Sequence, residues 1–357
     1  MHVLAEYIWM DGGSEETPVQ HLRSKTRVIS VDPNTIIGAD TFPVWGFDGS
    51  STNQAMTSNS DQVLKPVCVV NDPIRGAANF LVMCEVEDAN GVSHPSNTRA
   101  KLRNVLDNGG DAHESWFGFE QEYTLYKGRN PLGWPDSGAP SRNQGPYYCG
   151  VGADEVAGRE MVEAHLQACM RAGIMIYGIN AEVMLGQWEY QIGHRDFPGE
   201  TADPLTVADH LWLSRWILYR IGENFGVTAK LDCKPEPGDW NGAGAHTNFS
   251  TKEMRDPITG KTAIVSAIEA LSKTHKLHIT DYGHGLDQRL TGRHETCSIN
   301  EFVAAESDRG ASIRIPSHVN KVGYGYIEDR RPGANCDPYK VCARILHTIG
   351  SPVPASV

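Results

Sequence analysis

The sequence lacks several features that would place it in particular classes of protein. No apolar run approaches the length of a membrane span, and the N-terminal residues lack the basic and apolar regions of a signal peptide. Basic residues are in the minority, because the chain of 357 residues carries 32 Lys and Arg against 44 Asp and Glu, for a net charge of −12. This balance argues against binding to nucleic acid or to an anionic membrane as a main task.

Familiar cofactor motifs are missing as well. The eight cysteines are scattered without a C-x-x-C pair, which argues against a zinc ribbon or a thioredoxin-type site. In a chain of this length without an export signal, we expect reduced thiols and a cytoplasmic location. Neither G-x-x-x-x-G-K-[ST] nor G-x-G-x-x-G occurs, so metal ions and arginines would have to hold the phosphates of any nucleotide.

Two glutamates stand two residues apart in an otherwise apolar run, residues 116–125. Strand side chains alternate between faces, so Glu120 and Glu122 would point the same way, with Cα atoms about 7 Å apart. Two carboxylates on an enclosed face repel each other unless a cation joins them. A solvated strand face is the plainer interpretation, but the flanking aromatic residues indicate burial and favour a site for a hard metal. Gln121 would then belong to the packing behind the site.

A second carboxylate pair supports a metal site. Residues 179–192 are typical of a tight hairpin in which Leu185 and Gly186 form the turn. Glu182 and Glu189 would then lie directly opposite each other, an arrangement that destabilises a sheet unless something is coordinated there.

His246 follows a glycine-rich loop that begins at Asn241. A lone histidine is usually structural, but five candidate carboxylates elsewhere in the chain make this one a fair ligand. Oxygen ligands with one imidazole suit Mg²⁺ or Mn²⁺ better than zinc. Three arginine-bearing segments, 289–293, 309–314 and 328–331, leave an anion site and ordinary surface charges equally open.

Two regions differ in their pattern. Residues 1–97 contain short strand-like runs separated by turns, which predicts a small, mostly β domain. Residues 98–357 alternate helical and strand patterns. We expect one helix capped by Asp154 and stopped by Gly173, another with a capping box at Thr206 and Asp209 and a stop at Gly226, and a third around residues 264–271.

Seven motifs, taken in order, resemble those of the glutamine synthetase family, specifically its type II, eukaryotic-like class. They are WGFDGSST at 45–52, FEQEY at 119–123, NAEVMLGQWEYQ at 180–191, GDWNGAGAHTN at 238–248, RLTGRHET at 289–296, RGASIR at 309–314 and EDRRP at 328–332. The resemblance covers nearly the whole chain. It implies an α+β fold in which a small N-terminal β-grasp domain, residues 1–97, precedes a catalytic α/β domain with a curved antiparallel sheet, residues 98–357.

The same resemblance implies that the chain makes L-glutamine from L-glutamate, ammonium and ATP through γ-glutamyl phosphate. It also implies two or more Mg²⁺ or Mn²⁺ ions per site and a decamer of two stacked pentamers with active sites between subunits. One metal would be held by Glu122, Glu182 and Glu189, and the other by Glu120, His246 and Glu328.

The remaining roles also come from the resemblance. Asn241, Gly242, Arg289, Arg309 and Arg330 would bind glutamate or the transferred phosphoryl group, and Arg314 the nucleotide phosphates. Asp48, from a neighbouring subunit, and Glu295, on a loop that closes over the intermediate, would handle ammonium, with Arg309 also catalytic. The remaining nucleotide contacts would be Trp116, Glu189, Asn248, Ser250 and Tyr326.

The chain departs from family patterns at Asn53, Ala181 and Leu185, in a longer segment at 194–204 and in the tail 351–357, without losing a candidate ligand. Three alternatives remain: a γ-glutamyl-amine ligase, a guanidino kinase, and a catalytically dead relative that only forms rings. Retention of Asp48 and Glu295 favours ammonium over a larger amine. A guanidino kinase would not need the domain that carries Asp48, and a dead relative should have lost metal ligands.

Overall fold

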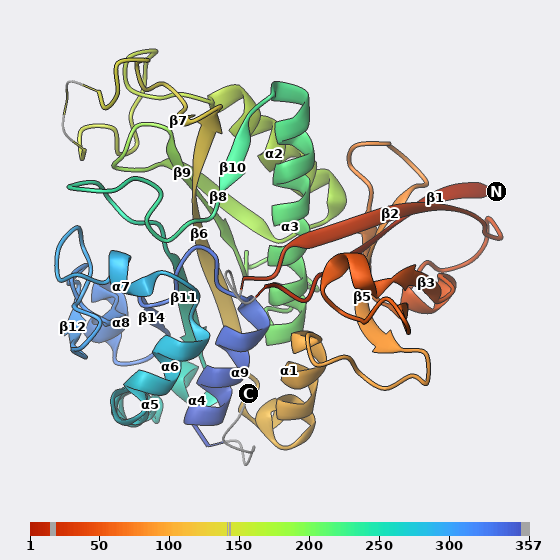
Figure 1. The fold of residues 1–357 in the computed structure, drawn as a ribbon. Coiled ribbons are helices and arrows are strands. Elements are labelled where there is room, and N and C mark those ends of the chain that lie inside the picture. Colours follow the sequence, from red (N-terminus) through yellow and green to blue (C-terminus); the bar gives the residue numbers. More distant parts are fainter. Residues whose placement is uncertain (15–18, 141, 143, 351–357) are drawn as a thin grey trace.

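The computed structural model describes residues 1–14, 19–140, 142 and 144–350, so the divergent tail at 351–357 lies outside the described residues. The first 88 residues form one β-sheet and the later strands form a second, larger one (Figure 1). Among the described residues, helices accompany only the second sheet, apart from short 3₁₀ turns, which agrees with the predicted change of pattern along the chain.

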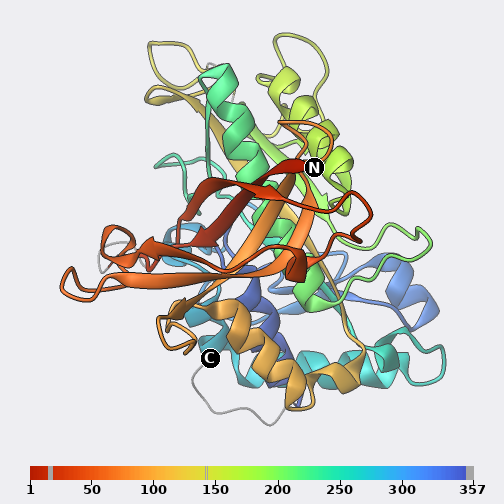
Figure 2. The same ribbon diagram turned by 90° about the vertical axis from the view of Figure 1, so that its right-hand side faces the viewer.

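The N-terminal sheet has the strand order β2-β1-β5-β4-β3. Strands β1 and β5 are parallel, and the other neighbours are antiparallel. This is the expected β-grasp arrangement, and Figure 2 views it from the side of this sheet. The elements are β1 His2–Met10, β2 Leu22–Ser30, η1 Ala39–Thr41, β3 Trp45–Asp48, η2 Gly49–Thr52, β4 Asp61–Asn71 and β5 Phe80–Asp88.

Strand alternation gives β1 two different packing partners. Tyr7 and Trp9 face the core of the small sheet, whereas Ile8 and Met10 join the main core of the second domain. An ion-pair cluster reinforces this junction: Arg99 reaches Glu85 of β5 at 2.9 Å and forms two bonds of 2.8 and 2.9 Å with Asp209. The small domain is therefore fixed to the large one by both apolar and charged contacts.

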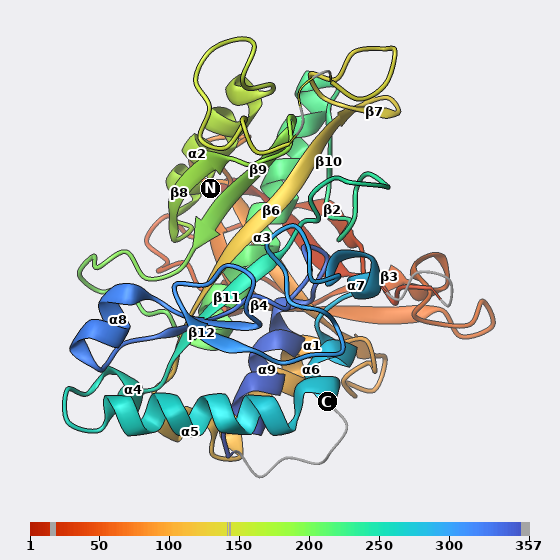
Figure 3. The same cartoon turned by 90° about the vertical axis from the view of Figure 1, so that its left-hand side faces the viewer.

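The second sheet is a mostly antiparallel, curved sheet with the order β12-β13-β14-β11-β6-β9-β8, and the short strands β7 and β10 also pair with β6. Strand β6 runs through its centre (Figure 3). The strands are β6 Trp116–Lys127, β7 Asn130–Pro131, β8 Ile176–Ala181, β9 Gln187–Ile192, β10 Thr228–Lys230, β11 Ala245–Ser250, β12 Ala304–Glu306, β13 Ile313–Ile315 and β14 Ile327–Asp329.

Helix α3 packs behind this sheet. Two of the three predicted helices begin at a different residue from the one expected. The helices are α1 Thr98–Asp107, η3 Gly110–His113, α2 Arg159–Ala172, α3 Pro204–Phe225, α4 Lys252–Arg255, α5 Gly260–Lys273, α6 His275–Asp281, α7 Leu286–Arg289, α8 Ser317–Val322 and α9 Pro338–Thr348. No helix among these described residues is long and apolar enough to cross a membrane.

The prediction that Asp154 caps α2 is wrong, because the helix begins at Arg159 after Gly158. Gly158 has a φ of 85°, and a Cβ there would come within 2.4 Å of the Leu125 side chain. This tight approach to β6 fixes where the helix can start. The stop at Gly173, with φ 84°, is confirmed.

The predicted capping box at Thr206 and Asp209 is also wrong. Asp203 caps α3 by accepting from the amides of Leu205 and Thr206, and Pro204 occupies the first helical position. Asp209 is instead buried in the domain junction with Arg99. The stop at Gly226 and the helix around residues 264–271, observed as α5, are confirmed.

The prediction for Gln121 is confirmed. Its side chain is fully buried on the α3 side of the sheet, where its carbonyl oxygen accepts from Arg215 at 2.9 and 2.6 Å. Arg215 also donates to the carbonyls of Ala334 and Cys336. This network fixes the centre of β6 from behind, so that Glu120 and Glu122 project from the opposite face.

Candidate active site

An acidic cavity of about 320 Å³ opens on the face of the second sheet opposite α3. A larger cavity of about 710 Å³ lies between residues 19–22 and α3, but the carboxylates in its described lining are only Glu223 and Asp232. The smaller cavity is the one that gathers carboxylates, a histidine and arginines. It is lined by Glu120, Glu122, Tyr148, Glu182, Glu189, His246, Arg309, Arg314, Glu328 and Arg330.

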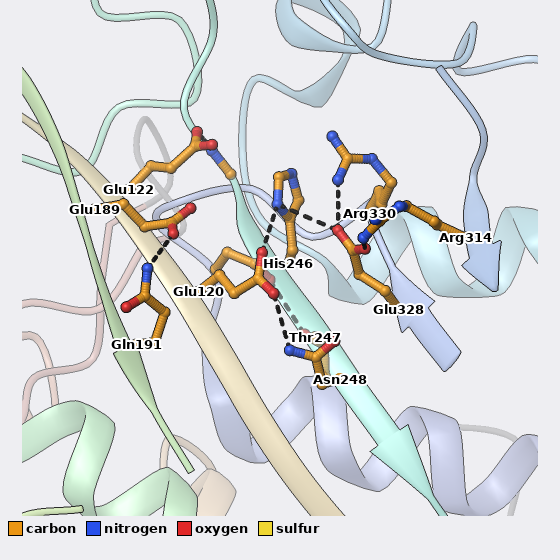
Figure 4. A network of polar contacts seen from close by, with 12 residues as sticks. Glu120, Glu122, Glu189, Gln191, His246, Thr247, Asn248, Arg314, Glu328 and Arg330 are labelled. Atoms are coloured by element: carbon orange, nitrogen blue, oxygen red, sulfur yellow. Dashed lines mark hydrogen bonds and ion pairs between the residues drawn. The ribbon is translucent and has the colours of Figure 1, made fainter. Parts of the chain in front are cut away.

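Strand register brings these side chains together. Glu122 on β6 lies directly opposite Glu189 on β9, and Glu120 lies opposite His246 on β11. One strand further on, Glu328 on β14 pairs with Asn248 of β11. Four neighbouring strands therefore present one polar side chain after another on the same face (Figure 4).

The predicted pairing of Glu182 with Glu189 is wrong. Ala181 pairs with Trp188, so Glu189 lies opposite Asn180, and residues 182–186 form a wider connection. A two-residue hairpin turn needs a positive φ at its first central residue. Leu185 does not adopt one, and only Gly186 does, with φ 89°. The opposed like charges exist, but they are Glu122 and Glu189 on strands β6 and β9.

The ligand atoms form two groups that share His246. Atoms of Glu120, His246 and Glu328 lie within 4.8 Å of one another, and so do atoms of Glu122, Glu189 and His246. The Nδ1 atom of His246 is 3.3 Å from Glu120 Oε2 and 3.7 Å from Glu328 Oε1. Each group offers carboxylate oxygens and one imidazole, which is a donor set for Mg²⁺ or Mn²⁺.

Glu182 lines the same cavity but belongs to neither group. Its carboxylate accepts from the side-chain amide of Asn180 at 3.0 Å and from the backbone amide of Val183 at 3.2 Å. These contacts hold Glu182 beside Glu122 and Glu189, the two residues with which the glutamine synthetase resemblance grouped it.

Burial raises the pKa of three of the carboxylates, those of Glu122, Glu182 and Glu189. Burial, reinforced by the charges of Glu120, Glu182 and Glu122, raises the pKa of Glu189 well above its usual range. Burial and the nearby Glu122 raise the pKa of Glu182 to about 8. A divalent cation would reverse this cost by favouring the ionised forms.

Burial also lowers the pKa of His246 well below its usual value, and the positive charge of Arg330 adds to the shift. These shifts favour the neutral imidazole, which is the form that binds a metal ion. The guanidinium of Arg289 lies 3.2 Å from the other ring nitrogen, Nε2.

Arginines line the side of the cavity near β13 and β14. Arg314 donates to Glu328 Oε2 at 2.7 Å, and Arg330 donates to the other oxygen of the same carboxylate. Arg309, about half exposed, lies 3.2 Å from Glu295. Positive side chains thus border the carboxylates, as a site for a metal-bound anion requires.

Comparisons with known proteins decide the family. The profile described as "Glutamine synthetase, beta-Grasp domain" matches residues 3–89. The chain is 54% identical over 346 residues to a glutamine synthetase from Streptomyces viridochromogenes, covering 96% of each chain. The chain belongs to the glutamine synthetase family.

Other relatives agree. The chain is 53% identical over 352 residues to the chloroplastic glutamine synthetase of Chlamydomonas reinhardtii, covering 97% of this chain and 90% of that one. A cryo-EM structure of Plasmodium falciparum glutamine synthetase superposes with a TM-score of 0.75 at 16% identity, over 97% of this chain and 71% of that one. The latter is a likeness of fold. Both bacterial and eukaryotic relatives fit the type II class.

Among the residues that the glutamine synthetase resemblance assigns to glutamate, Arg309 and Arg330 line the cavity, whereas Asn241, Gly242 and Arg289 lie outside its lining. Asn241 and Gly242 precede β11, and the carbonyl of Gly242 accepts from Gln187 at 2.8 Å. A Cβ at Gly242 would lie 2.7 Å from the side chain of Arg289. Arg289 itself is buried, and it donates to the carbonyls of Arg330 and Arg331.

Three of the residues assigned to the nucleotide, Trp116, Ser250 and Tyr326, lie at or next to the ends of β6, β11 and β14. Trp116 stacks on His194 with ring centres 4.4 Å apart, and the Arg255 guanidinium lies 4.1 Å from the Trp116 ring. Ser250, opposite Trp116, accepts from Arg255 at 3.0 Å. Asn248 donates to Glu120 at 2.9 Å, and the ring centre of Tyr326 lies 5.7 Å from that of His318.

Asp48 stands apart from this cavity in the single chain. It is exposed at the start of η2, where its carboxylate accepts from the amide and hydroxyl of Ser50 at 2.9 and 2.6 Å. These bonds hold its pKa below the usual range. Asn53 closes the same turn in the left-handed conformation, φ 57°, which Asn tolerates well in place of a glycine.

Sequence reasoning missed Tyr148, which lines the cavity and lies 5.5 Å from the Arg309 guanidinium. It also missed His194 and Arg255 beside Trp116. The only signal for Tyr148 was its place in a loop rich in proline, glycine and aromatic residues, and such composition alone does not point at a site.

Proposed function

We propose that the chain catalyses the ATP-dependent ligation of ammonia to the γ-carboxylate of L-glutamate, giving L-glutamine, ADP and phosphate through γ-glutamyl phosphate. The observation that carries the proposal is the presence of two groups of metal-ligand atoms that share His246 and are bordered by arginines. Membership of the glutamine synthetase family, at about half identity over nearly the full chain, supports the choice of substrates.

The donor set fits two divalent cations of the Mg²⁺ or Mn²⁺ type. We assign one to Glu120, His246 and Glu328, whose ligand atoms already converge. The other belongs to Glu122 and Glu189, with Glu182 joining from beside them. When bound, the cations neutralise phosphate charge and orient the reacting oxygens. Strand pairing supplies the rigidity that such positioning needs.

Phosphoryl transfer gains mostly from alignment and from charge neutralisation. Arg309, Arg314 and Arg330 border the cavity and are the candidates for binding the phosphates of ATP or the transferred group. Trp116, Asn248, Ser250 and Tyr326, with Glu189, are assigned to the nucleotide side. Asn241, Gly242, Arg289, Arg309 and Arg330 are assigned to glutamate.

The second step requires ammonium to be attracted and deprotonated close to the acyl phosphate. We assign this task to Glu295 and to Asp48 of a neighbouring subunit, within a decamer of two stacked pentamers. Because Asp48 is exposed in the single chain, its carboxylate is free to contact the active site of another subunit. Asp48→Ala should impair ammonium use far more than nucleotide binding, measured as KM for ammonium and by titration with a nucleotide analogue. Equal loss of both would remove Asp48 from this role.

A coupled assay of ATP hydrolysis tests the reaction directly. Phosphate release should require both glutamate and ammonium, and omission of either should reduce it. Replacing ammonium with a panel of larger amines tests the γ-glutamyl-amine alternative in the same format. Phosphate release that needs neither co-substrate would overturn the assignment. The expected cytoplasmic location stays a prediction, and one relative is chloroplastic.

A further inference from the structure

Two adjacent residues beside the cavity adopt an unusual backbone conformation. His294 has a φ of 52° and Glu295 a φ of 61°, both in the left-handed region. Residues other than glycine rarely adopt this region, and two in succession persist only when the surroundings hold them. The turn brings the carboxylate of Glu295 to 3.2 Å from Arg309, which lines the cavity.

The base of this loop is closed by Thr296. Its hydroxyl donates to the carbonyls of Arg293 and Arg289 at 2.8 and 3.1 Å, and the amide of Thr291 approaches it at 3.3 Å. These bonds tie residues 289–296 into a ring. Because Thr296 bonds to Arg293, they close the turn that contains His294 and Glu295, and the Glu295 carbonyl also accepts from Arg330 at 3.5 Å. The bonds of Thr296 do not join this turn to the neighbouring loops, and a further contact is needed for that.

His294 supplies that contact through both ring nitrogens. Nε2 lies 2.9 Å from Asp239 Oδ1, and Nδ1 meets the side-chain amide nitrogen of Gln144. One neutral tautomer satisfies both partners, because Nε2–H donates to the carboxylate while Nδ1 accepts from the amide. The imidazole is mostly buried, with 19% of its side chain exposed, whereas that of Asp239 is 90% exposed.

The two partners belong to different loops around the cavity. Asp239 precedes the glycine-rich loop that leads to β11 and His246. Gln144 belongs to the loop that carries Tyr148, and this loop is bonded to the Glu182 connection: the Gly145 amide donates to the Val183 carbonyl at 2.6 Å. A single imidazole therefore connects the Glu295 loop to segments on both sides of the carboxylates.

We propose that His294 is a positioning residue, which holds Glu295 over the cavity by bridging Gln144 and Asp239. The inference rests on the proposed function, because it assigns a reason for holding Glu295 in place during the second step. Without the bridge, water would take the place of ammonia at the γ-glutamyl phosphate. The bond between the acyl carbon and the phosphate oxygen would break, glutamate would re-form, and ATP would be spent without glutamine.

The test compares His294→Asn with the wild-type enzyme in the full chain. Asparagine tolerates the left-handed conformation but is too short to reach both partners, so the substitution removes the bridge and spares the backbone. We expect phosphate released per glutamine formed to rise from near one to above two. We also expect KM for ammonium to rise about tenfold while KM for ATP changes little, since small misplacements of a reacting group are costly.

Asp239→Ala removes the acceptor on the other side of the bridge, at a side chain that is 90% exposed. It should change the phosphate-to-glutamine ratio in the same direction, and the double variant should be no worse than His294→Asn alone. His113→Asn, the same substitution on η3, is the matched control. A wild-type enzyme that forms no glutamine would refute the proposed function. A coupled wild type with unchanged ratios in both bridge variants would overturn the role of His294.

Discussion

Replacing Glu182 by glutamine should stabilise the metal-free protein and weaken its response to metal. The folded-state pKa of Glu182 is raised from 4.5 to about 8, first by burial and then by Glu122. Since the folded pKa lies above the unfolded one, folding disfavours the ionised form. The penalty is absent below about pH 4.5 and grows until the pH reaches about 8.

The magnitude follows from the size of that shift. At pH 7 the penalty is about 3 kcal/mol, since each pKa unit corresponds to about 1.4 kcal/mol. Glutamine stays neutral, but its amide group can accept only one of the two bonds that Glu182 receives from Asn180 and Val183, at a cost of about 1 kcal/mol. The net gain is about 2 kcal/mol, or about 3 °C in Tm for a chain of 357 residues.

Thermal unfolding in chelator at pH 5, 7 and 8 measures this effect. The gain in Tm should be near zero at pH 5 and should grow with pH. Added Mn²⁺ should reverse the order, because the cation restores the ionised form only in the wild type. Glu253→Gln, an exposed glutamate on α4, is the control and should show no trend with pH. Equal destabilisation of the metal-free Glu182 variant at pH 5 and pH 8 would refute the reasoning.

Other parts of the structure give further predictions. His246→Asn should weaken Mn²⁺ binding about 10- to 100-fold in calorimetric titration, since its imidazole belongs to both ligand groups. Unchanged binding would exclude it as a ligand. Arg215→Lys should cost about 3 kcal/mol in denaturant unfolding, because lysine cannot reproduce its bonds to Gln121 and the two buried carbonyls. Asp203→Ala should cost about 1 kcal/mol through loss of the α3 cap, and Thr206→Ala much less; the reverse order would restore the capping box to Thr206.

Sequence reasoning succeeded where a feature depends on local interactions and failed where it depends on contacts between distant residues. Alternation along one strand is local, so the opposite directions of Glu120 and Gln121 could be predicted from residues 116–125 alone. Gly173 and Gly226 were equally predictable as helix ends, because the left-handed conformation they adopt favours glycine whatever surrounds it. Helix starts were less predictable. Gly158 begins α2 because of how closely it approaches Leu125, and no local pattern records that contact.

The site itself depends on pairings between distant segments. The opposition of Glu122 and Glu189 requires β6 to pair with β9, and that of Glu120 and His246 requires β6 to pair with β11. Sequence reasoning instead paired Glu189 with its near neighbour Glu182, because a short hairpin was the only pairing visible locally. The motif resemblance placed Glu122, Glu189 and His246 in one site, and the structure brings their side chains together; their roles stay predictions.

The pairing of strands β9, β6, β11 and β14 also makes assembly of the active site depend on correct strand alignment. If β11 slipped by one residue, Ala245 or Thr247 would stand opposite Glu120, and His246 would turn into the apolar layer beneath α3. Such a chain could keep most of its backbone bonds, yet neither group of ligands would assemble. Metal affinity in this protein therefore reports on strand alignment: a preparation that binds its cations has also paired its central strands correctly.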